Sequence, residues 1–308
     1  MENSELRMGP MEWALLVGLS LCWGCSFLFF KVLMATLPIF TVVLCRVGVA
    51  AVILNLLMLL LRRPLPLDAK VWRQFFVMGF LNCIGTFTLT AWAVSHIQSG
   101  LASILNASAP VSAVLLAHVL TANEKLTSQR LLGVLAGLCG VAILIGPAAL
   151  RHLGGNEMWA QLACLLSTVF AATAAIYGRR FSGLPPLTVA TGQVTAATAM
   201  VLPFVLIFDR PWTLAAPKVG LWIDILGFAV ICSVFAYLLF FRLLASAGAI
   251  NLQLVTFLIP VVALFLGWIV LGEAVAPRSY LGMAVICLGL FLIDGRAIRY
   301  LRLRPATG

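Results

Sequence analysis

Charged residues are scarce in this sequence. They make up 10% of the 308 residues, whereas a typical soluble domain has about a quarter. Long polar stretches are missing too: the longest connection between apolar runs, from Arg62 to Lys70, contains Pro64 and Pro66 and has the length of a linker. Because 63% of the residues are hydrophobic, little sequence is left for a soluble domain.

The motifs of the common enzyme classes are also missing. The chain has no His-Glu-x-x-His, no Gly-x-Ser-x-Gly, no Asp-rich metal motif and no phosphate-binding loop. The serines and histidines inside apolar runs are not spaced as a catalytic group requires. We therefore expect no enzymatic activity, no cofactor and no metal site.

A disulfide framework is not indicated. The eight cysteines all fall inside apolar runs, where a buried cysteine behaves as a small hydrophobic residue. Cys22 and Cys25 have the spacing of a redox pair, but redox chemistry needs an accessible thiolate in a soluble fold. We interpret both as packing residues.

Long apolar runs dominate what is present. A bilayer core of about 30 Å is spanned by about 20 apolar residues in a helix. The first run is too long for a signal peptide and lacks a small-residue cleavage site. The fold predicted is an all-α integral membrane protein with ten transmembrane helices. The runs are 12–34, 39–61, 71–94, 100–121, 130–150, 157–178, 187–208, 219–242, 249–271 and 278–294.

The basic residues gather at the ends of these runs, although the net charge of +10 alone would suit a nucleic-acid partner. With the N-terminus in the cytoplasm, 14 Lys and Arg residues fall on the inside and four on the outside. This asymmetry follows the positive-inside rule and predicts that both termini are cytoplasmic. The C-terminal arginine cluster is also suited to contact anionic lipid. We expect membrane lipid and no nucleic acid as partners.

One pattern of polar residues, proline, glutamate and glycines occurs twice. Glu follows the proline by 14 residues in the first copy and 13 in the second, and the two glycines follow at identical spacings. We interpret this as a duplication into residues 1–152 and 153–308. The first copy is Ser103, Asn106, Pro110, Glu124, Gly133 and Gly140. The second copy is Gln253, Thr256, Pro260, Glu273, Gly282 and Gly289.

Five spans in each half imply that the second half enters the membrane in the opposite orientation, as an inverted repeat. Pro110 and Pro260 then fall near mid-membrane as helix breaks. Each proline frees the carbonyl four residues earlier, that of Asn106 or Thr256. A freed carbonyl in the membrane must face protein, water or ligand. Polar groups for a substrate are therefore expected there.

Further polar and aromatic residues extend this candidate site. Trp23 is either core packing or the wall of a cavity. Arg46 lies deep in the second run and either marks a site or hydrogen-bonds to helix-end carbonyls; we favour the latter. His96 is interpreted as a helix-end cap. The predicted substrate site comprises Trp23, Ser26, Asn82, Trp92, Ser103, Asn106, Tyr177, Tyr237, Gln253 and Thr256.

These motifs resemble the EamA-type branch of the drug/metabolite transporter superfamily. The resemblance rests on Trp-Gly-x-Ser-Phe at Trp23 to Phe27, on Arg46, and on the duplicated pattern. It covers nearly the whole chain, although the extra residue between Pro110 and Glu124 departs from the usual spacing. It implies two five-helix repeats and export of small metabolites across the bacterial inner membrane. Amino acids, including aromatic ones, are a common substrate class of this branch; purines, sugars and drugs are others.

The expected function is a carrier that moves a small neutral or zwitterionic metabolite by alternating access around a central cavity. No acidic pair is available for a cation, and the deepest carboxylate, Asp224, lies about five residues into its run. We therefore predict no carboxylate proton relay; transport is facilitated or weakly dependent on His. A channel-like facilitator is the alternative, and the assembly is a monomer or homodimer.

Overall fold

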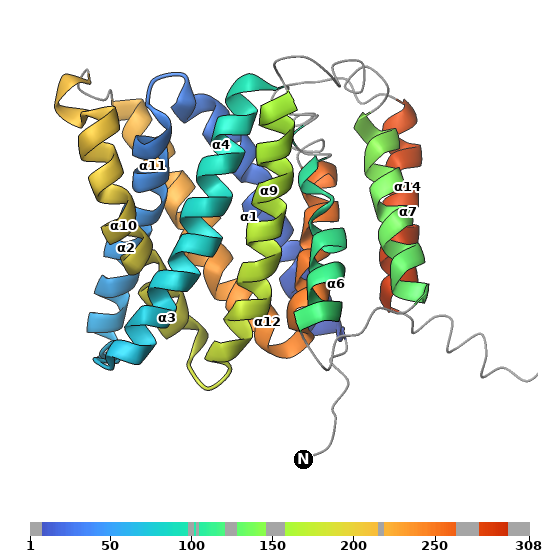
Figure 1. Cartoon of the computed structure of the whole chain (residues 1–308), viewed down its shortest axis with the longest axis horizontal. Coiled ribbons are helices and arrows are strands. Elements are labelled where there is room, and N and C mark those ends of the chain that lie inside the picture. The colour runs from blue at the N-terminus through green and yellow to red at the C-terminus, as the bar shows by residue number, and fades with distance from the viewer. Residues whose placement is uncertain are drawn as a thin grey trace, which may run out of the picture.

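The structure is a computed structural model, and it describes residues 8–97, 102, 105–120, 128–145, 158–214, 219–262 and 277–294. The described elements are helices, and Figure 1 shows them standing side by side as one bundle. The first half contains α1 (Pro10–Met34), α2 (Ile39–Leu60), α3 (Ala69–Gly79), η1 (Phe80–Gly85), α4 (Thr86–His96), α6 (Ala109–Leu120) and α7 (Ser128–Ile145). The second half contains α9 (Met158–Gly178), η3 (Arg179–Phe181), α10 (Pro186–Phe204), η4 (Val205–Asp209), η5 (Pro211–Thr213), α11 (Val219–Ala229), η6 (Val230–Phe235), α12 (Ala236–Gln253) and α14 (Pro277–Asp294).

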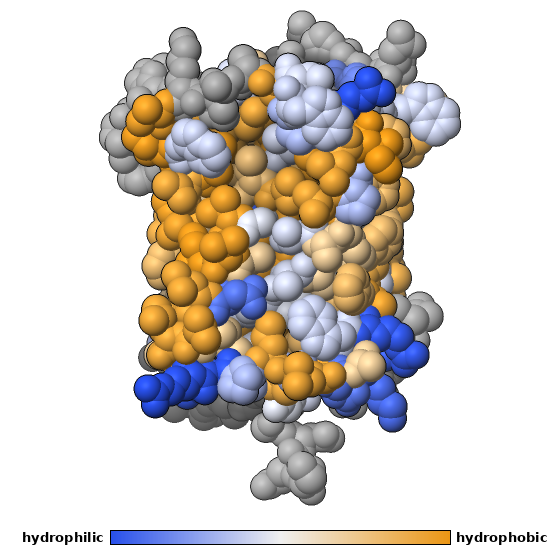
Figure 2. Space-filling model, turned by 90° about the vertical axis from the view of Figure 1, so that its left-hand side faces the viewer, coloured by the Kyte–Doolittle hydropathy of each residue, from blue (hydrophilic) through white to orange (hydrophobic). Residues whose placement is uncertain are grey.

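Six helical stretches in the described ranges are long and apolar enough to cross a membrane. They are Pro10–Met34, Ile39–Leu60, Ala69–His96, Met158–Phe181, Pro186–Asp209 and Val219–Ala249. The remaining predicted spans correspond to α6, α7, α14 and residues 249–262. These are helical over shorter described ranges, and the last of them is interrupted by a turn at Leu254. Figure 2 shows hydrophobic side chains over the middle of one face and hydrophilic side chains toward its two ends. The chain is a multi-pass membrane protein.

Local sequence signals begin these helices. Pro10 and Pro186 occupy the first position of α1 and α10, where a missing N–H costs nothing. Before α3, the Asp68 carboxylate accepts a hydrogen bond of 2.8 Å from the Lys70 N–H, as an N-cap does. The start of α2 has no cap of its own, but Asp209 from η4 accepts bonds of 2.6 and 2.8 Å from the Thr41 N–H and hydroxyl.

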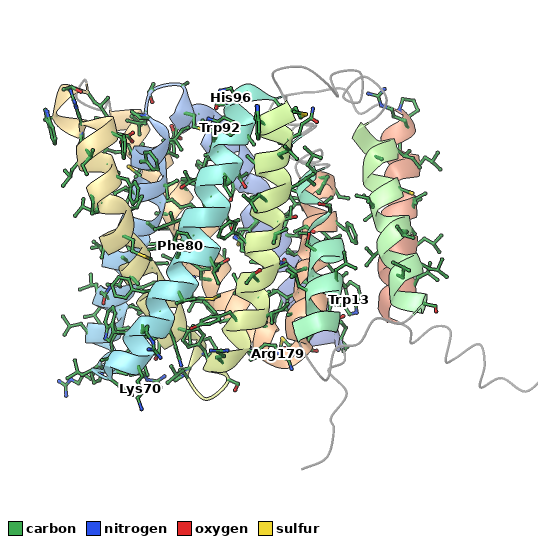
Figure 3. The ribbon with its side chains drawn as sticks, in the orientation of Figure 1. Trp13, Lys70, Phe80, Trp92, His96 and Arg179 are labelled. Atoms are coloured by element: carbon green, nitrogen blue, oxygen red, sulfur yellow. The ribbon has the colours of Figure 1, made fainter. Side chains whose placement is uncertain are left out.

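Labelled side chains distinguish the two ends of the bundle. In Figure 3, Trp13, Lys70 and Arg179 lie at one end, Trp92 and His96 lie at the other, and Phe80 lies between them. We call the end that carries Lys70 and Arg179 the basic end. Lys70 and Arg179, which the sequence predicts on one side of the membrane, lie at the same end of the bundle.

Two helices are interrupted by π-helices at matching places. An 11-residue α-helix precedes each one, α3 before η1 and α11 before η6, and each π-helix has six residues. A π-helix widens the turn and disturbs the regular hydrogen-bond ladder.

The ends of α2 and η4 also resemble each other. A residue with left-handed backbone geometry follows each of them, Arg62 with φ 54° after α2 and Arg210 with φ 47° after η4.

The glycine-rich run of the first half packs within the chain. Helices α7 and α14 lie side by side at one edge of Figure 1. A Cβ atom on Gly289 would lie 2.6 Å from the backbone nitrogen of Gly137, and one on Gly140 would lie 2.9 Å from the carbonyl oxygen of Gly282. Backbone at this distance leaves no room for a side chain, so glycines set the approach of these helices.

Candidate functional site

The elements expected around the central site are neighbours in the structure. Helix α1 packs on α12, α4 and α6 pack on α9, and α6 also packs on α12. The Trp23 ring of α1 lies 5.8 Å, centroid to centroid, from Phe240 of α12, and Phe240 in turn meets Tyr237 edge-on at 6.4 Å. Aromatic side chains therefore form a continuous contact from the middle of α1 into α12.

Helix α1 also approaches the segment that carries the second proline. A Cβ atom on Gly24 would lie 2.5 Å from Cγ1 of Val262 and 3.7 Å from the carbonyl oxygen of Ile259. Gly24 lies between Trp23 and Ser26 in sequence, so the absence of a side chain there brings these two residues next to the segment around Pro260.

Three predicted site residues have buried polar atoms without a hydrogen-bond partner: Nε1 of Trp23, Oγ of Ser26 and Nε2 of Gln253. Ser26 is 5% exposed and Gln253 is 3% exposed. Leaving a buried donor or acceptor unpaired costs about 1–3 kcal/mol. Such atoms on packed helices are suited to receive the polar groups of a ligand.

The first polar-proline motif coincides with a helix interruption. Residues 105 and 106 are helical, a turn follows at 107–108, and Pro110 is the second residue of α6. The turn is closed by the Ser108 N–H and hydroxyl, which donate to the Leu105 carbonyl at 3.1 and 2.6 Å. The helix is interrupted near Pro110, as predicted, but the break is the turn at 107–108, and Pro110 itself lies in the first turn of the next helix. Asn106 is half-buried just before the turn, and Ser103 lies outside the described residues.

The second motif has its interruption six residues before the proline. A turn at Leu254 separates α12 from the helix over 255–262, which contains Pro260. The Thr256 hydroxyl donates to the carbonyl of Gln253 at 2.8 Å, so it satisfies the end of α12. The Thr256 hydroxyl, predicted from the sequence to contact the substrate, is therefore bonded within the protein. The Gln253 amide nitrogen has no hydrogen-bond partner.

Asn82, another predicted site residue, is engaged with protein. Its Nδ2 donates to Oε1 of Gln193 at 3.2 Å, which joins η1 to α10. Asn82 is 4% exposed and Gln193 is fully buried, with Nε2 unpartnered. Gln193 is not among the site residues predicted from the sequence, because no sequence pattern indicates that η1 and α10 meet.

Arg46 of α2, in the first half of the chain, makes the contact that corresponds to that of Gln193 in the second half. Its Nε donates to the Ser233 hydroxyl at 3.1 Å and its Nη2 to the Cys232 carbonyl at 2.8 Å, both in η6. The guanidinium carbon lies 3.8 Å from the Phe87 ring centroid and 4.8 Å from that of Phe228. Among side chains that the structure describes, Arg46 is the only charged one that is fully buried. Of the two readings of Arg46, this geometry matches the hydrogen bond to a helix carbonyl.

The four aromatic residues of the predicted substrate site, Trp23, Trp92, Tyr177 and Tyr237, are spread along the bundle. Tyr237 is fully buried, with its hydroxyl 3.2 Å from Sγ of Cys83. Trp92 packs on His96 at 4.7 Å at the end opposite the basic end (Figure 3), and Nδ1 of His96 lies 2.9 Å from the Trp92 carbonyl. Tyr177 lies beneath Arg180 at 4.9 Å. Trp23 and Tyr237 share the Phe240 contact, whereas Trp92 and Tyr177 belong to opposite ends.

Two neighbouring hydroxyl residues of α9, Ser167 and Thr168, form a polar seam that was not predicted as part of the site from the sequence. The Thr90 hydroxyl of α4 donates to Ser167 at 3.2 Å, and Ser112 of α6 lies 3.1 Å from the Thr168 hydroxyl. The sequence does not show which helices Ser167 and Thr168 face. The structure shows that Ser167 faces α4 and Thr168 faces α6. The seam joins elements of the first half to α9.

Comparison with known proteins agrees with a transporter. Over 282 residues the chain is 23% identical to the uncharacterized transporter YoaV of Bacillus subtilis (strain 168), covering 90% of this chain and 94% of that protein. It is 25% identical over 300 residues to a probable terminal-alkyne amino-acid exporter of Streptantibioticus cattleyicolor, covering 95% and 96%. One crystal structure superposes with a TM-score of 0.76 at 18% identity, over 92% of this chain and 96% of the other, which establishes a shared fold.

The model of the EamA-like transporter family matches twice, over residues 11–146 and 158–294. The two matches together include nearly all of the described helices. Matches of this extent establish the family, whereas each short sequence motif by itself was weak evidence for it. The chain is a membrane transporter that belongs to the EamA-like transporter family.

Proposed function

We propose that this transporter is a carrier that exports small neutral or zwitterionic metabolites, with amino acids, including aromatic ones, as the first candidates. The observation that carries the proposal is the set of buried, unpartnered polar atoms on Trp23, Ser26 and Gln253. These atoms offer hydrogen bonds to a polar ligand beside the aromatic contact of Trp23 and Phe240. A mostly apolar site with a few placed polar groups suits a small organic solute.

The mechanism proposed is alternating access between two inverted five-helix repeats, residues 1–152 and 153–308. The matching π-helices, the two left-handed arginines and the two helix interruptions support this division. Interrupted helices near the membrane centre are a feature of carriers built from inverted repeats. Asn106 and Gln253, each next to an interruption, are the proposed polar contacts for the substrate.

The substrate class is supported by charge and by one relative. No Asp or Glu is buried within the described ranges, which disfavours a cationic substrate. A relative of similar length is named as a probable terminal-alkyne amino-acid exporter. The proposed location is the bacterial inner membrane with both termini in the cytoplasm; Lys70 and Arg179 at one end fit that orientation.

The test is uptake of radiolabelled amino acids into proteoliposomes by wild-type, Asn106→Ala and Gln253→Ala proteins. We expect at least about a tenfold loss of transport for Gln253→Ala, as when a buried hydrogen bond to substrate is removed. Asn251→Ala is the matched control, because the Asn251 amide on the same segment is already satisfied by the Ala247 carbonyl at 2.9 Å. Unchanged transport in both Asn106→Ala and Gln253→Ala would refute the site, and saturable flux with trans-stimulation separates a carrier from a channel.

A further inference from the structure

A pocket of about 210 Å³ opens at the basic end of the bundle (Figure 3), and none of the residues predicted for the substrate site lines it. It lies between η3, the start of α10 and α12. An apolar cavity of about 150 Å³ is large enough to hold a benzene molecule. The pocket therefore has room for one aromatic ring.

The inner walls of the pocket are apolar. A polar group placed against them would lose its hydration and find no partner among their side chains. A ligand must therefore present hydrocarbon to the interior of the pocket. The lining residues that are buried are Gly178, Phe181, Val189, Phe241, Leu244 and Gly248.

The mouth of the pocket faces water. Ser182 and Ala245 line it and are exposed, and Ser182 supplies a hydroxyl. Arg179 also lines the pocket, but it already has an interaction within the protein, so it has no role in the binding inferred below. The sequence over 158–204 and 236–253, which forms α9, η3, α10 and α12, contains no Asp or Glu that could bind an ammonium group. A charged end of the ligand therefore stays in water at the mouth.

Backbone geometry shapes this space. Gly248 has φ 82° and makes a kink inside α12, a conformation that only glycine adopts without strain. On the facing side, a Cβ atom on Gly178 would lie 2.7 Å from Cδ2 of Leu244. The two glycines thus fix how α12 approaches α9 around the pocket.

One wall of the pocket is connected to the proposed substrate site by aromatic contacts. The Phe241 ring meets that of Phe240 edge-on, with 4.9 Å between the ring centroids. The Phe240 ring in turn lies 5.8 Å from that of Trp23. The single ring of Phe240, which is 2% exposed, therefore links the pocket wall to the aromatic residue of the substrate site.

We propose that this pocket is a loading site, where an aromatic amino acid binds before it enters the substrate site. Its ring lies against Phe181, Phe241 and Leu244, since aromatic rings favour edge and offset contacts with one another, and its charged groups stay in water beside Ser182. The inference rests on the proposed function, because it takes aromatic amino acids as substrates. The basic end is the predicted cytoplasmic end, which is where an exporter collects its substrate.

The test is equilibrium binding of radiolabelled phenylalanine to the full-length protein in detergent. The wild type should bind about two molecules per chain, one in each apolar site. Ala245→Phe fills the pocket from its exposed mouth and should bind about one molecule, because the added ring takes the space of the ligand. Ser246→Phe is the matched control, since it adds the same ring at an adjacent exposed position outside the lining, and it should bind like the wild type.

Two further measurements keep the result independent of folding. Ala245→Leu fills less of the space and should have an intermediate effect, and the thermal midpoint of each variant shows that it is folded. Alanine has the same charged groups as phenylalanine and no ring, so it should bind only at the substrate site. Alanine binding at both sites would contradict a pocket that selects a ring.

The loading site and the substrate site fail in different ways. Equal phenylalanine binding by Ala245→Phe and Ser246→Phe would overturn the loading site and leave the substrate site standing. A loss in Ala245→Phe with no change in Gln253→Ala would support the pocket and refute Gln253 as a substrate contact. Phospholipid that copurifies with the wild type and is absent from Ala245→Phe would assign the pocket to an acyl chain and overturn the loading site. Absence of phenylalanine binding in the wild type would refute both.

Discussion

Arg46 donates a hydrogen bond of 2.8 Å to the carbonyl of Cys232, a residue 186 positions later in the chain. The acceptor lies in the π-helix η6, where the regular backbone ladder is disturbed. Helix α10 packs against α2, and its Gln193 accepts from Asn82 in the π-helix η1. In both cases a polar side chain of an α-helix contacts a π-helix from the other half of the chain.

Replacing Arg46 should destabilise the fold strongly. Arg46→Ala removes two hydrogen bonds and the contacts with Phe87 and Phe228; we expect a loss of about 3 kcal/mol or more. Arg46→Lys should recover only part of this stability. Lysine keeps the positive charge, but its ammonium group cannot reproduce the planar guanidinium geometry. The measurement is the thermal midpoint of the detergent-solubilised protein. A midpoint unchanged in Arg46→Ala would contradict a structural role.

The Asn82–Gln193 contact predicts a coupling between the two positions. Gln193→Leu alone leaves the Asn82 amide buried without its partner and should cost about 1–3 kcal/mol. Replacing both residues by leucine should cost less than the sum of the single changes, with a coupling of about 1 kcal/mol. The four proteins of this double-mutant cycle are compared by denaturant or thermal unfolding. Strict additivity would show that the two side chains do not depend on each other.

The close approach of α7 and α14 predicts that Gly289 does not tolerate alanine. The added Cβ would lie 2.6 Å from the Gly137 nitrogen, and backbone cannot yield as a side chain does. We expect a loss of about 1–3 kcal/mol, as in overpacked cores. Gly220→Ala in α11 is the matched control, since its Cβ would meet nothing within 4 Å. Similar unfolding temperatures for the two variants would argue against tight packing at Gly289.

Transport should not require a proton gradient. Proton-driven carriers commonly place Asp, Glu or His inside the membrane, and among described side chains no carboxylate is buried; Asp224 is half-buried in α11. Flux in proteoliposomes should therefore be the same with and without an imposed pH gradient, and Asp224→Asn should transport like the wild type. A flux that depends strongly on the pH gradient, or a loss of transport in Asp224→Asn, would indicate a proton relay through a carboxylate.

Part of the candidate site could be predicted from the sequence. Trp23, Ser26 and Gln253 are predicted because they are polar or aromatic residues inside apolar runs, and in the structure a polar atom of each is buried without a hydrogen-bond partner. Asn82 and Tyr237 meet the same criterion, but their polar groups contact other protein side chains, those of Gln193 and Cys83. Composition marks polar atoms that need a partner, but it does not say whether protein or substrate supplies it.

The sequence by itself determined that this is a helical membrane protein, because apolar runs of spanning length dictate helices in a solvent that cannot satisfy backbone groups. It also determined the duplicated pattern and the family. Only the tertiary structure decided where the helices break, that Pro110 lies in the first turn of a helix, and that Arg46 and Gln193 contact π-helices from the other half of the chain. The contacts of Arg46 and Gln193 join residues more than 100 positions apart, and local spacing in the sequence carries no information about them.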